Sequence, residues 1–218
     1  ISTDYTWLGD FPKTKEWIGD RAVQDLTAHK YTITKKRFEL TIGMDRDFII
    51  YDNLGMVKPR IQQMAHDGRT HYDELIFPLL EENGTCYDGK AFFATDHKVG
   101  TKNVSNLGDL PLTQANFLST RASMMNQKGE NGKKLGVKPN IIVVSPALEA
   151  VALRLFKADQ IEGSTNITKD MVEILVIADL TDDKAWYLMD TSRPLKPLVL
   201  QINKPIEFTA MDKADDEA

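Results

Sequence analysis

The chain has 218 residues, of which 42% are hydrophobic and 27% are charged, so it is long enough to bury one sizeable core or two small ones. Its single cysteine, Cys86, excludes an internal disulfide and fits a reducing compartment. The net charge of −5 argues against a strong nucleic-acid grip, and no apolar run reaches the ~18 residues of a membrane span. These features predict an intracellular globular protein.

The first twenty residues carry more large apolar side chains than a free tail would. Trp7, Phe11 and Trp17 lie within TWLGDFPKTKEWIGD. We expect this segment to dock on a surface, and a local mini-core is the alternative.

Residues 21–46 change to a strand pattern with a period of two residues. The alternating apolar positions are Phe38, Leu40, Ile42 and Met44. If Lys35-Lys36 forms a two-residue turn, Ile33 faces Phe38 and Tyr31 faces Leu40. An isolated two-stranded ribbon is marginal in water, so this one is expected to find a neighbouring surface in its own chain or in another.

Residues 55–83 have the period of one long helix. Its apolar face carries Val57, Ile61, Met64, Ala65, Gly68, Tyr72, Leu75, Ile76 and Leu79. At 1.5 Å per residue such a helix is about 40 Å long and must extend beyond a small domain. Pro59 and Pro78 predict kinks, and two shorter helices broken near Gly68 are the alternative.

A loop-rich stretch follows, and it is the place where an enzymatic site would lie. Cys86, Asp88, Asp96 and His97 are metal ligands by residue type. No zinc, Walker or Rossmann spacing accompanies them, so structural hydrogen bonding within the loop is the preferred interpretation. A metal-assisted hydrolase using Asp88, Asp96 and His97 is the alternative. We expect Phe92 and Phe93 to anchor the loop to a core.

The second half of the chain reads as a small α/β or α+β unit. Thr113 is expected to cap a helix that runs to about Lys128. A buried strand at 141–144 then leads into a helix with Ser145 as N-cap and Pro146 at its first position. Further strand candidates are Val172–Ile177, Ala185–Met189, Leu198–Ile202 and Ile206–Phe208.

A protruding ribbon and an overlong helix are what an assembly subunit needs, because such elements gain stability by contacting copies of the same chain. Several segments carry a resemblance in the same order over nearly the whole chain. They are WLGDFPKTKEWIGDR, YTITKKRFELTIGMDRD, TCYDGKAFFATDH, KPNIIVVSPALEA and WYLMDTSRPLKPLVLQINKPIEF. These segments resemble the Mu-like phage and prophage major head subunit family.

The resemblance implies an α+β protein with the tailed-phage (Hong Kong phage-type) capsid fold. Such a fold combines an extended ribbon called the E-loop, a long spine helix in a peripheral domain, and a compact mixed α/β axial domain. By position, residues 1–20 correspond to the end of the N-terminal arm, 21–47 to the E-loop, 48–138 to the peripheral domain with its spine helix at about 55–83, 139–190 to the axial domain, and 191–218 to strands returning toward the peripheral domain and an acidic tail. Family members continue further at both ends, so we expect a processed or incomplete piece.

The implied function is that of a major capsid protein, which assembles in the bacterial cytoplasm into the icosahedral shell of a virion. Its partners would be its own copies in pentamers and hexamers, together with scaffolding, decoration and portal proteins, and packaged DNA through weak non-specific contact only. No membrane, cofactor, metal or enzymatic activity is expected. The candidate inter-subunit contacts are Trp7, Trp17, Lys35, Lys36, Arg37, Phe38, Asp45 and Asp47. A phage-associated scaffold or binding module is a further alternative.

Overall fold

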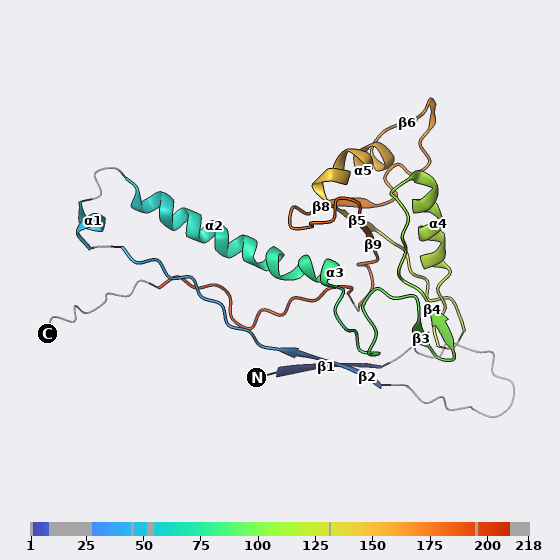
Figure 1. The fold of residues 1–218 in the computed structure, drawn as a ribbon, viewed down its shortest axis with the longest axis horizontal. Coiled ribbons are helices and arrows are strands. Elements are labelled where there is room, and N and C mark those ends of the chain that lie inside the picture. The colour runs from blue at the N-terminus through green and yellow to red at the C-terminus, as the bar shows by residue number, and fades with distance from the viewer. Residues whose placement is uncertain are drawn as a thin grey trace. The chain divides into compact units, whose positions relative to one another are not determined.

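The computed structural model describes residues 2–8, 28–44, 46–51, 55–130, 132–194 and 196–209 (Figure 1). The chain divides into two compact units, and each is assembled from segments that are distant in the sequence. The first unit combines Ile1–Glu39 with Phe77–Pro197, and the second combines Leu40–Ile76 with Leu198–Ala218. Both helices and strands are present, as expected for the α+β class.

The first unit contains a two-stranded ribbon and a compact region of helices and short strands. The ribbon consists of β1 (Ser2–Leu8) and β2 (Ala28–Thr34). The other elements are α3 (Pro78–Glu82), β3 (His97–Val99), β4 (Lys102–Val104), α4 (Gln114–Met125), β5 (Ile141–Val144), the 3-10 helix η1 (Pro146–Leu148), α5 (Glu149–Phe156), β6 (Gln160–Ile161), β7 (Ser164–Thr165), β8 (Glu173–Val176) and β9 (Trp186–Met189).

Strand β5 is the centre of a three-stranded sheet with the order β8-β5-β9. It runs parallel to β8 and antiparallel to β9, and Ile142 is paired with both Ile174 and Leu188. A strand covered on both faces is apolar without alternation, and the Ile-Ile-Val-Val run of β5 has this character because its last three residues are buried. The strands predicted at 141–144, 172–177 and 185–189 are therefore confirmed, with ends that differ by a residue.

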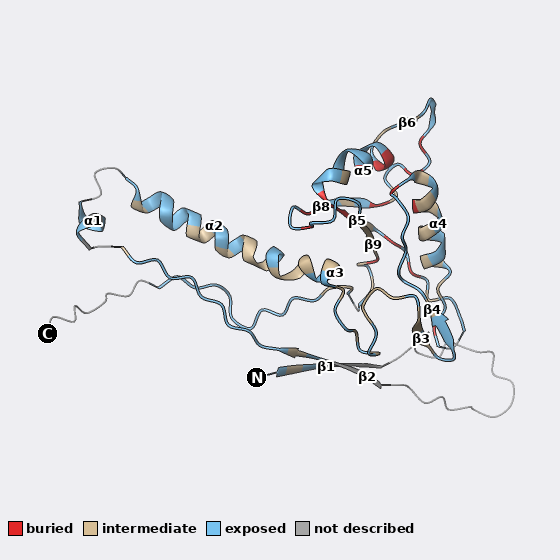
Figure 2. Ribbon diagram, viewed as in Figure 1, coloured by how far each residue is buried: buried red, intermediate tan, exposed pale blue. Residues whose placement is uncertain are grey.

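One face of this sheet forms the main core together with α4 and α5. Phe117 of α4 and Phe156 of α5 are fully buried and meet edge to face, with ring centroids 4.7 Å apart. The buried members of this core are Leu112, Phe117, Ile142, Val144, Ala152, Leu155, Phe156 and Val172. Figure 2 shows the buried residues of the first unit gathered around β5, α4 and α5.

The other face of the sheet is covered in part by the loop that follows α3. Val143 alternates with Ile142 along β5, so its side chain lies on this second face, where it is buried. Tyr187, its partner in β9, contacts the ring of Phe93 at a centroid distance of 5.4 Å. Phe92 meets Phe93 edge to face at 4.9 Å. The predicted anchoring of this loop by its two phenylalanines is confirmed.

The predicted helix starts are correct in position but not in every detail. Thr113 caps α4, because its hydroxyl accepts a hydrogen bond from the Asn116 backbone N–H at 3.2 Å. Pro146 occupies the first position of η1, as expected. Ser145 occupies the N-cap position of η1, as predicted, but its side chain makes no capping hydrogen bond and lies fully buried.

The ribbon pairs differently from the prediction. Strand β2 pairs antiparallel with β1, which sets Tyr31 opposite Tyr5 and Ile33 opposite Thr3. The predicted turn at Lys35-Lys36, with Ile33 facing Phe38 and Tyr31 facing Leu40, is therefore wrong. A two-residue period identifies an extended segment but not its partner, and Ser2–Leu8 supplies a partner rich in β-branched and aromatic residues. Residues 35–44 continue as extended backbone outside any ladder of the described chain.

The second unit is built on the 20-residue helix α2 (Val57–Ile76), which is preceded by the short α1 (Arg46–Ile50). The predicted helical face is confirmed in part: Met64, Gly68, Tyr72 and Leu75 are half-buried and the opposite side is exposed. Ile61 and Leu79, which were predicted on the same face, are exposed. None of the described α2 residues is fully buried, and Figure 2 accordingly shows the helix in tan and pale blue.

The predicted helix over 55–83 is divided at Phe77, and not near Gly68. Pro78 has no backbone N–H and cannot donate to the carbonyl four residues earlier, so one rung of the helical ladder is missing at this point. The shorter α3 ends at Asn83, whose left-handed φ of 48° closes the helix as the Asn83-Gly84 pair predicts.

The strands predicted at 198–202 and 206–208 are wrong, because this segment is extended but joins no ladder among the described residues. Ile206 instead packs against α2. A Cβ atom added at Gly68 would lie 3.4 Å from the Ile206 Cδ1 atom, so the glycine allows a close approach of this segment to the helix.

Candidate functional site

The loop between α3 and α4 brings together two of the predicted metal ligands. The Nδ1–H group of His97 donates to the Asp88 carboxylate at 2.6 Å, and its Nε2–H group donates to the Phe92 carbonyl at 3.0 Å. Both acceptors lack a proton, so this geometry suits an imidazolium that carries a proton on each nitrogen. Neither nitrogen is then available to bind a metal ion or to act as a base.

Electrostatics support a charged Asp88–His97 pair. Burial by itself lowers the pKa of His97, but the hydrogen bonds to Asp88 and to the Phe92 carbonyl outweigh it and raise that pKa above the ordinary 6.5. The hydrogen bond from His97 is the main cause that lowers the pKa of Asp88 below 3.8. The pair therefore stabilises the loop by holding the segments around Asp88 and His97 together.

The other two predicted ligands point elsewhere. Asp96 forms an ion pair with Lys90 at 2.5 Å, and both side chains are largely exposed. Burial is the main cause that raises the pKa of the Cys86 thiol, so the thiolate form that binds metals is disfavoured. Across the described residues, no three histidine, cysteine or acidic side chains gather as a metal site requires.

Two asparagines that sequence reasoning missed hold the same loop. The Asn83 side chain accepts from the Phe93 N–H at 2.6 Å and donates to the Phe93 carbonyl at 3.1 Å. The Asn106 side chain donates to the Phe92 carbonyl at 2.6 Å and accepts from the Ala94 N–H at 2.8 Å. Side-chain amides thus complete backbone pairs that no strand supplies, and a lone asparagine in a loop gives no sequence signal for this role.

The candidate inter-subunit residues fall on the ribbon and on the extended segment after it. Trp7 lies in β1, opposite His29. Lys35, Lys36, Arg37 and Phe38 are all exposed on the extended segment. Asp47 is exposed in α1, whereas Trp17 and Asp45 lie outside the described residues.

The extended segment presents large apolar side chains to solvent. Phe38, Leu40 and Ile42 are 55%, 53% and 44% exposed. The segment from 198 to 209 repeats this pattern at Val199, Ile202, Ile206 and Phe208. Contiguous apolar exposure of this kind marks an interaction surface.

Glu81 joins two parts of the first unit that are 100 residues apart in the sequence. Its carboxylate accepts from the Thr181 N–H and the Thr181 hydroxyl at 2.7 Å each, and from the Asp182 N–H at 2.9 Å. The backbone hydrogen bond from Asp182 is the main cause that lowers the pKa of Glu81. Glu81 is thus engaged within its own chain.

None of the helices in the described ranges is both long enough and apolar enough to cross a bilayer.

Three solved structures from bacteriophage JBD30 resemble the chain. The capsid aligns with a TM-score of 0.70 and 27% identity, over 82% of this chain and 86% of that chain. The capsid decorated with minor capsid protein trimers gives a TM-score of 0.68 at 27% identity, over 82% and 85% of the two chains. The procapsid gives 0.66 at 29% identity, over 82% and 87%. Fold and comparison together define the class as phage capsid proteins.

The family model of the Mu-like prophage major head subunit gpT matches residues 1–110, 108–180 and 176–218, so the chain belongs to this family. The major capsid protein of Escherichia phage Mu is 31% identical over 218 residues, which cover 99% of this chain and 52% of that protein. The FluMu major head subunit of Haemophilus influenzae is 29% identical over the same shares. The chain spans about half the length of these curated relatives. The match supports a structural protein and not the alternative of a metal-assisted hydrolase.

Proposed function

We propose that the subunit containing this chain is a major capsid protein, whose copies close into the icosahedral shell of a Mu-like phage or prophage. The observation that carries the proposal is the run of exposed, alternating apolar side chains at Phe38, Leu40 and Ile42, which stands on extended backbone. Apolar side chains left in water are unfavourable, and a second copy that covers them removes this cost.

We also propose which elements of this chain correspond to the parts of the capsid fold. We take the β1–β2 ribbon as the E-loop, which moves it toward the N-terminus from the predicted 21–47. We take α2 and α3 as the spine helix, interrupted at Pro78. The three-stranded sheet with α5 lies within the predicted axial limits of 139–190. Half-burial of α2 supports its role, since a helix with an incompletely covered apolar face gains from contact with other chains.

The partners are proposed on the same basis. Copies of the subunit come first, because the contacts of a closed shell are heterologous and join into rings. Decoration proteins are a second class, supported by the minor capsid protein trimers on the JBD30 capsid. Scaffolding and portal proteins, assembly in the bacterial cytoplasm and location in the virion stay predictions from the family.

The proposal is tested by replacing side chains on one side of the extended segment in the full-length subunit. Leu40→Asp combined with Ile42→Asp should abolish closed particles in electron micrographs and leave slowly sedimenting subunits. Each carboxylate would have to be buried at the contact, at a cost of several kcal/mol per ion.

Thr41→Asp is the matched control, since it adds a charge to the same segment at the opposite parity. We expect it to retain far more particle yield than the double variant. Normal shells from the double variant, with an unchanged thermal midpoint, would remove the extended segment from the assembly surface. No shells from the unchanged full-length subunit and its natural partners would contradict the proposed function itself.

A further inference from the structure

The positive charge of this acidic chain is unevenly placed. Residues 97–138 contain seven lysine and arginine residues against two acidic residues, a net charge of +5. Because the whole chain carries −5, the remainder carries −10. A local excess of this size in an acidic protein identifies a surface where an anion would be attracted.

Two hairpins bring much of this charge to one place. The first is β3–β4, whose turn contains Gly100 and which carries Lys98 and Lys102. The second, at 127–135, is closed by a bridge between Lys128 and Lys134. Two of its backbone hydrogen bonds run from the Gly129 N–H to the Lys133 carbonyl and from the Leu135 N–H to the Gln127 carbonyl, both at 2.9 Å.

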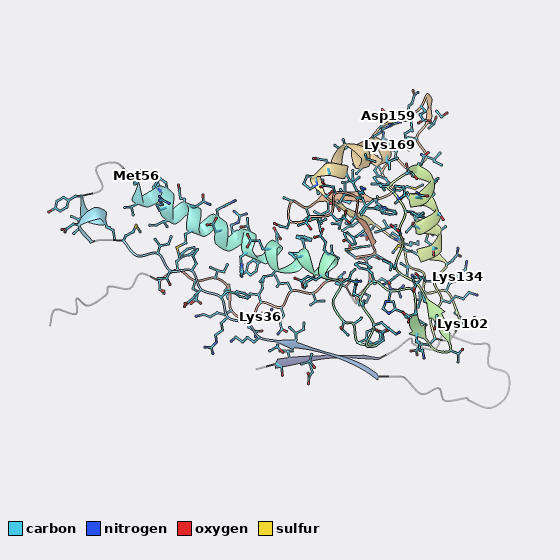
Figure 3. All side chains as sticks on the ribbon, in the orientation of Figure 1. Lys36, Met56, Lys102, Lys134, Asp159 and Lys169 are labelled. Atoms are coloured by element: carbon cyan, nitrogen blue, oxygen red, sulfur yellow. The ribbon has the colours of Figure 1, made fainter. Side chains whose placement is uncertain are left out.

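The hairpins touch each other and enclose an open cavity of about 420 Å³. A Cβ atom added at Gly100 would lie 3.5 Å from the Glu130 carbonyl oxygen, so the two turns are in contact. Lys102 and Lys128 line the cavity together with hydroxyl and amide side chains. These are Thr101, Asn103, Ser105, Ser123, Asn126 and Gln127. One acidic residue, Glu130, lines the cavity as well. Figure 3 labels Lys102 and Lys134 in this region, beside β3 and β4.

The lysines of this surface differ from those elsewhere in the chain. Lys90, Lys157 and Lys169 each hold a carboxylate of their own chain at 2.5 to 2.7 Å. Lys98, Lys102 and Lys128 are exposed, and none of them forms an ion pair within the described part of the chain. Among the described residues that line the cavity, Glu130 is the one acid beside Lys102 and Lys128, so a net positive charge stays there.

The character of the lining selects the anion. Lysine, hydroxyl and amide groups are those that contact phosphate oxygens along a nucleic-acid backbone. No aromatic ring lines the cavity, so bases have nothing on which to stack, and a single strand is disfavoured. Arg121, whose guanidinium could bind either a phosphate or a carboxylate, is half-buried and donates to the Met125 sulfur at 3.3 Å.

We propose that the surface formed by Lys98, Lys102, Lys128, Lys133 and Lys134 binds the phosphate backbone of duplex DNA without sequence preference. This inference rests on the proposed function, since a shell that holds DNA brings the duplex to its subunits. It also assigns the weak, non-specific DNA contact of the capsid to one place. The net charge of −10 on the rest of the chain favours a weak contact, which suits DNA that must enter and leave.

The test measures anisotropy of a fluorescent 20-base-pair duplex at low salt with the unassembled full-length subunit. Lys102→Glu combined with Lys128→Glu should weaken binding at least about tenfold and reduce the salt slope by about 2. The matched control is Lys58→Glu combined with Lys184→Glu, which changes the net charge equally at exposed positions elsewhere. It should keep most of the affinity, and circular dichroism should show both variants folded.

Each outcome decides the inference. A loss of DNA affinity that is confined to the Lys102→Glu, Lys128→Glu variant supports the inference. Replacing the duplex by one of another sequence should leave the affinity unchanged. An equal loss of DNA affinity in both double variants would show that only the net charge matters, and it would overturn the inference. Stronger binding of polyglutamate than of DNA would show a site for acidic peptides instead. Particle formation is scored separately by electron microscopy, so a subunit that builds shells but does not bind the duplex contradicts this inference alone.

Discussion

Replacing Glu81 by glutamine tests a polar link between parts of the first unit that are 100 residues apart in the sequence. The carboxylate accepts three hydrogen bonds from Thr181 and Asp182, at 2.7 to 2.9 Å. Hydrogen bonds to a charged acceptor contribute about 1.5 to 3 kcal/mol each when buried. Because these donors are exposed and water competes for them, we expect Glu81→Gln to lower the free energy of unfolding by about 1 to 2 kcal/mol in total.

The assay is urea unfolding of the full-length subunit at two pH values. The folded-state pKa of Glu81 is lowered, so its contribution is present above its ordinary value of 4.5 and is lost as pH falls through the folded-state value. The difference between wild type and Glu81→Gln should therefore be large at pH 7 and shrink in acid. The exposed neighbour Glu82 provides the control Glu82→Gln. Equal unfolding of the two variants at pH 7 would refute the reasoning.

Three further substitutions probe the two units. Asn166→Ala should lower the free energy of unfolding in urea by about 2 to 4 kcal/mol. The Ala158 carbonyl would lose the Asn166 amide donor at 2.8 Å, and the buried Thr168 N–H would lose the Asn166 side-chain oxygen as acceptor at 2.9 Å. A loss below about 1 kcal/mol would contradict this reasoning. Asp88 raises the pKa of His97, so the stabilisation by this pair is complete below pH 6.5 and is lost as pH rises through the folded-state pKa. The difference in free energy of unfolding between wild type and His97→Gln should therefore shrink between about pH 6 and pH 9. Gly68→Ala should raise the thermal midpoint through a gain of up to about 1 kcal/mol in helix propensity, since the new methyl group meets Ile206 at an ordinary 3.4 Å; a lower midpoint would show that the segment cannot yield.

The sequence was most informative where one local rule decides the outcome. The apolar run at 141–144 has no alternation, so it identifies a strand that is covered on both faces. The periodicity of α2 identifies which side is half-buried, and Thr113 identifies a helix start. In each case the responsible interactions lie within a few residues of one another.

Long-range pairing was where sequence reasoning failed. The alternation at 38–44 suggested this segment as the partner of β2, but a two-residue period is equally compatible with several partners. Loop-closure entropy differs little between nearby and distant partners, so the pairing of β2 with Ser2–Leu8 was not predictable. The contact of Glu81 with Thr181 spans 100 residues and leaves no periodic signal. The lysine surface was equally hidden, because Lys102 and Lys128 meet only when two hairpins pack together.

The central claim is that another copy of the subunit covers residues 36–44. Amide hydrogen exchange, compared between the free full-length subunit and the assembled particle, tests it most directly. We expect fast exchange over this segment in the free subunit, where its backbone joins no ladder among the residues that the structure describes, and slow exchange in the particle. Equal exchange rates in the two states would contradict the claim.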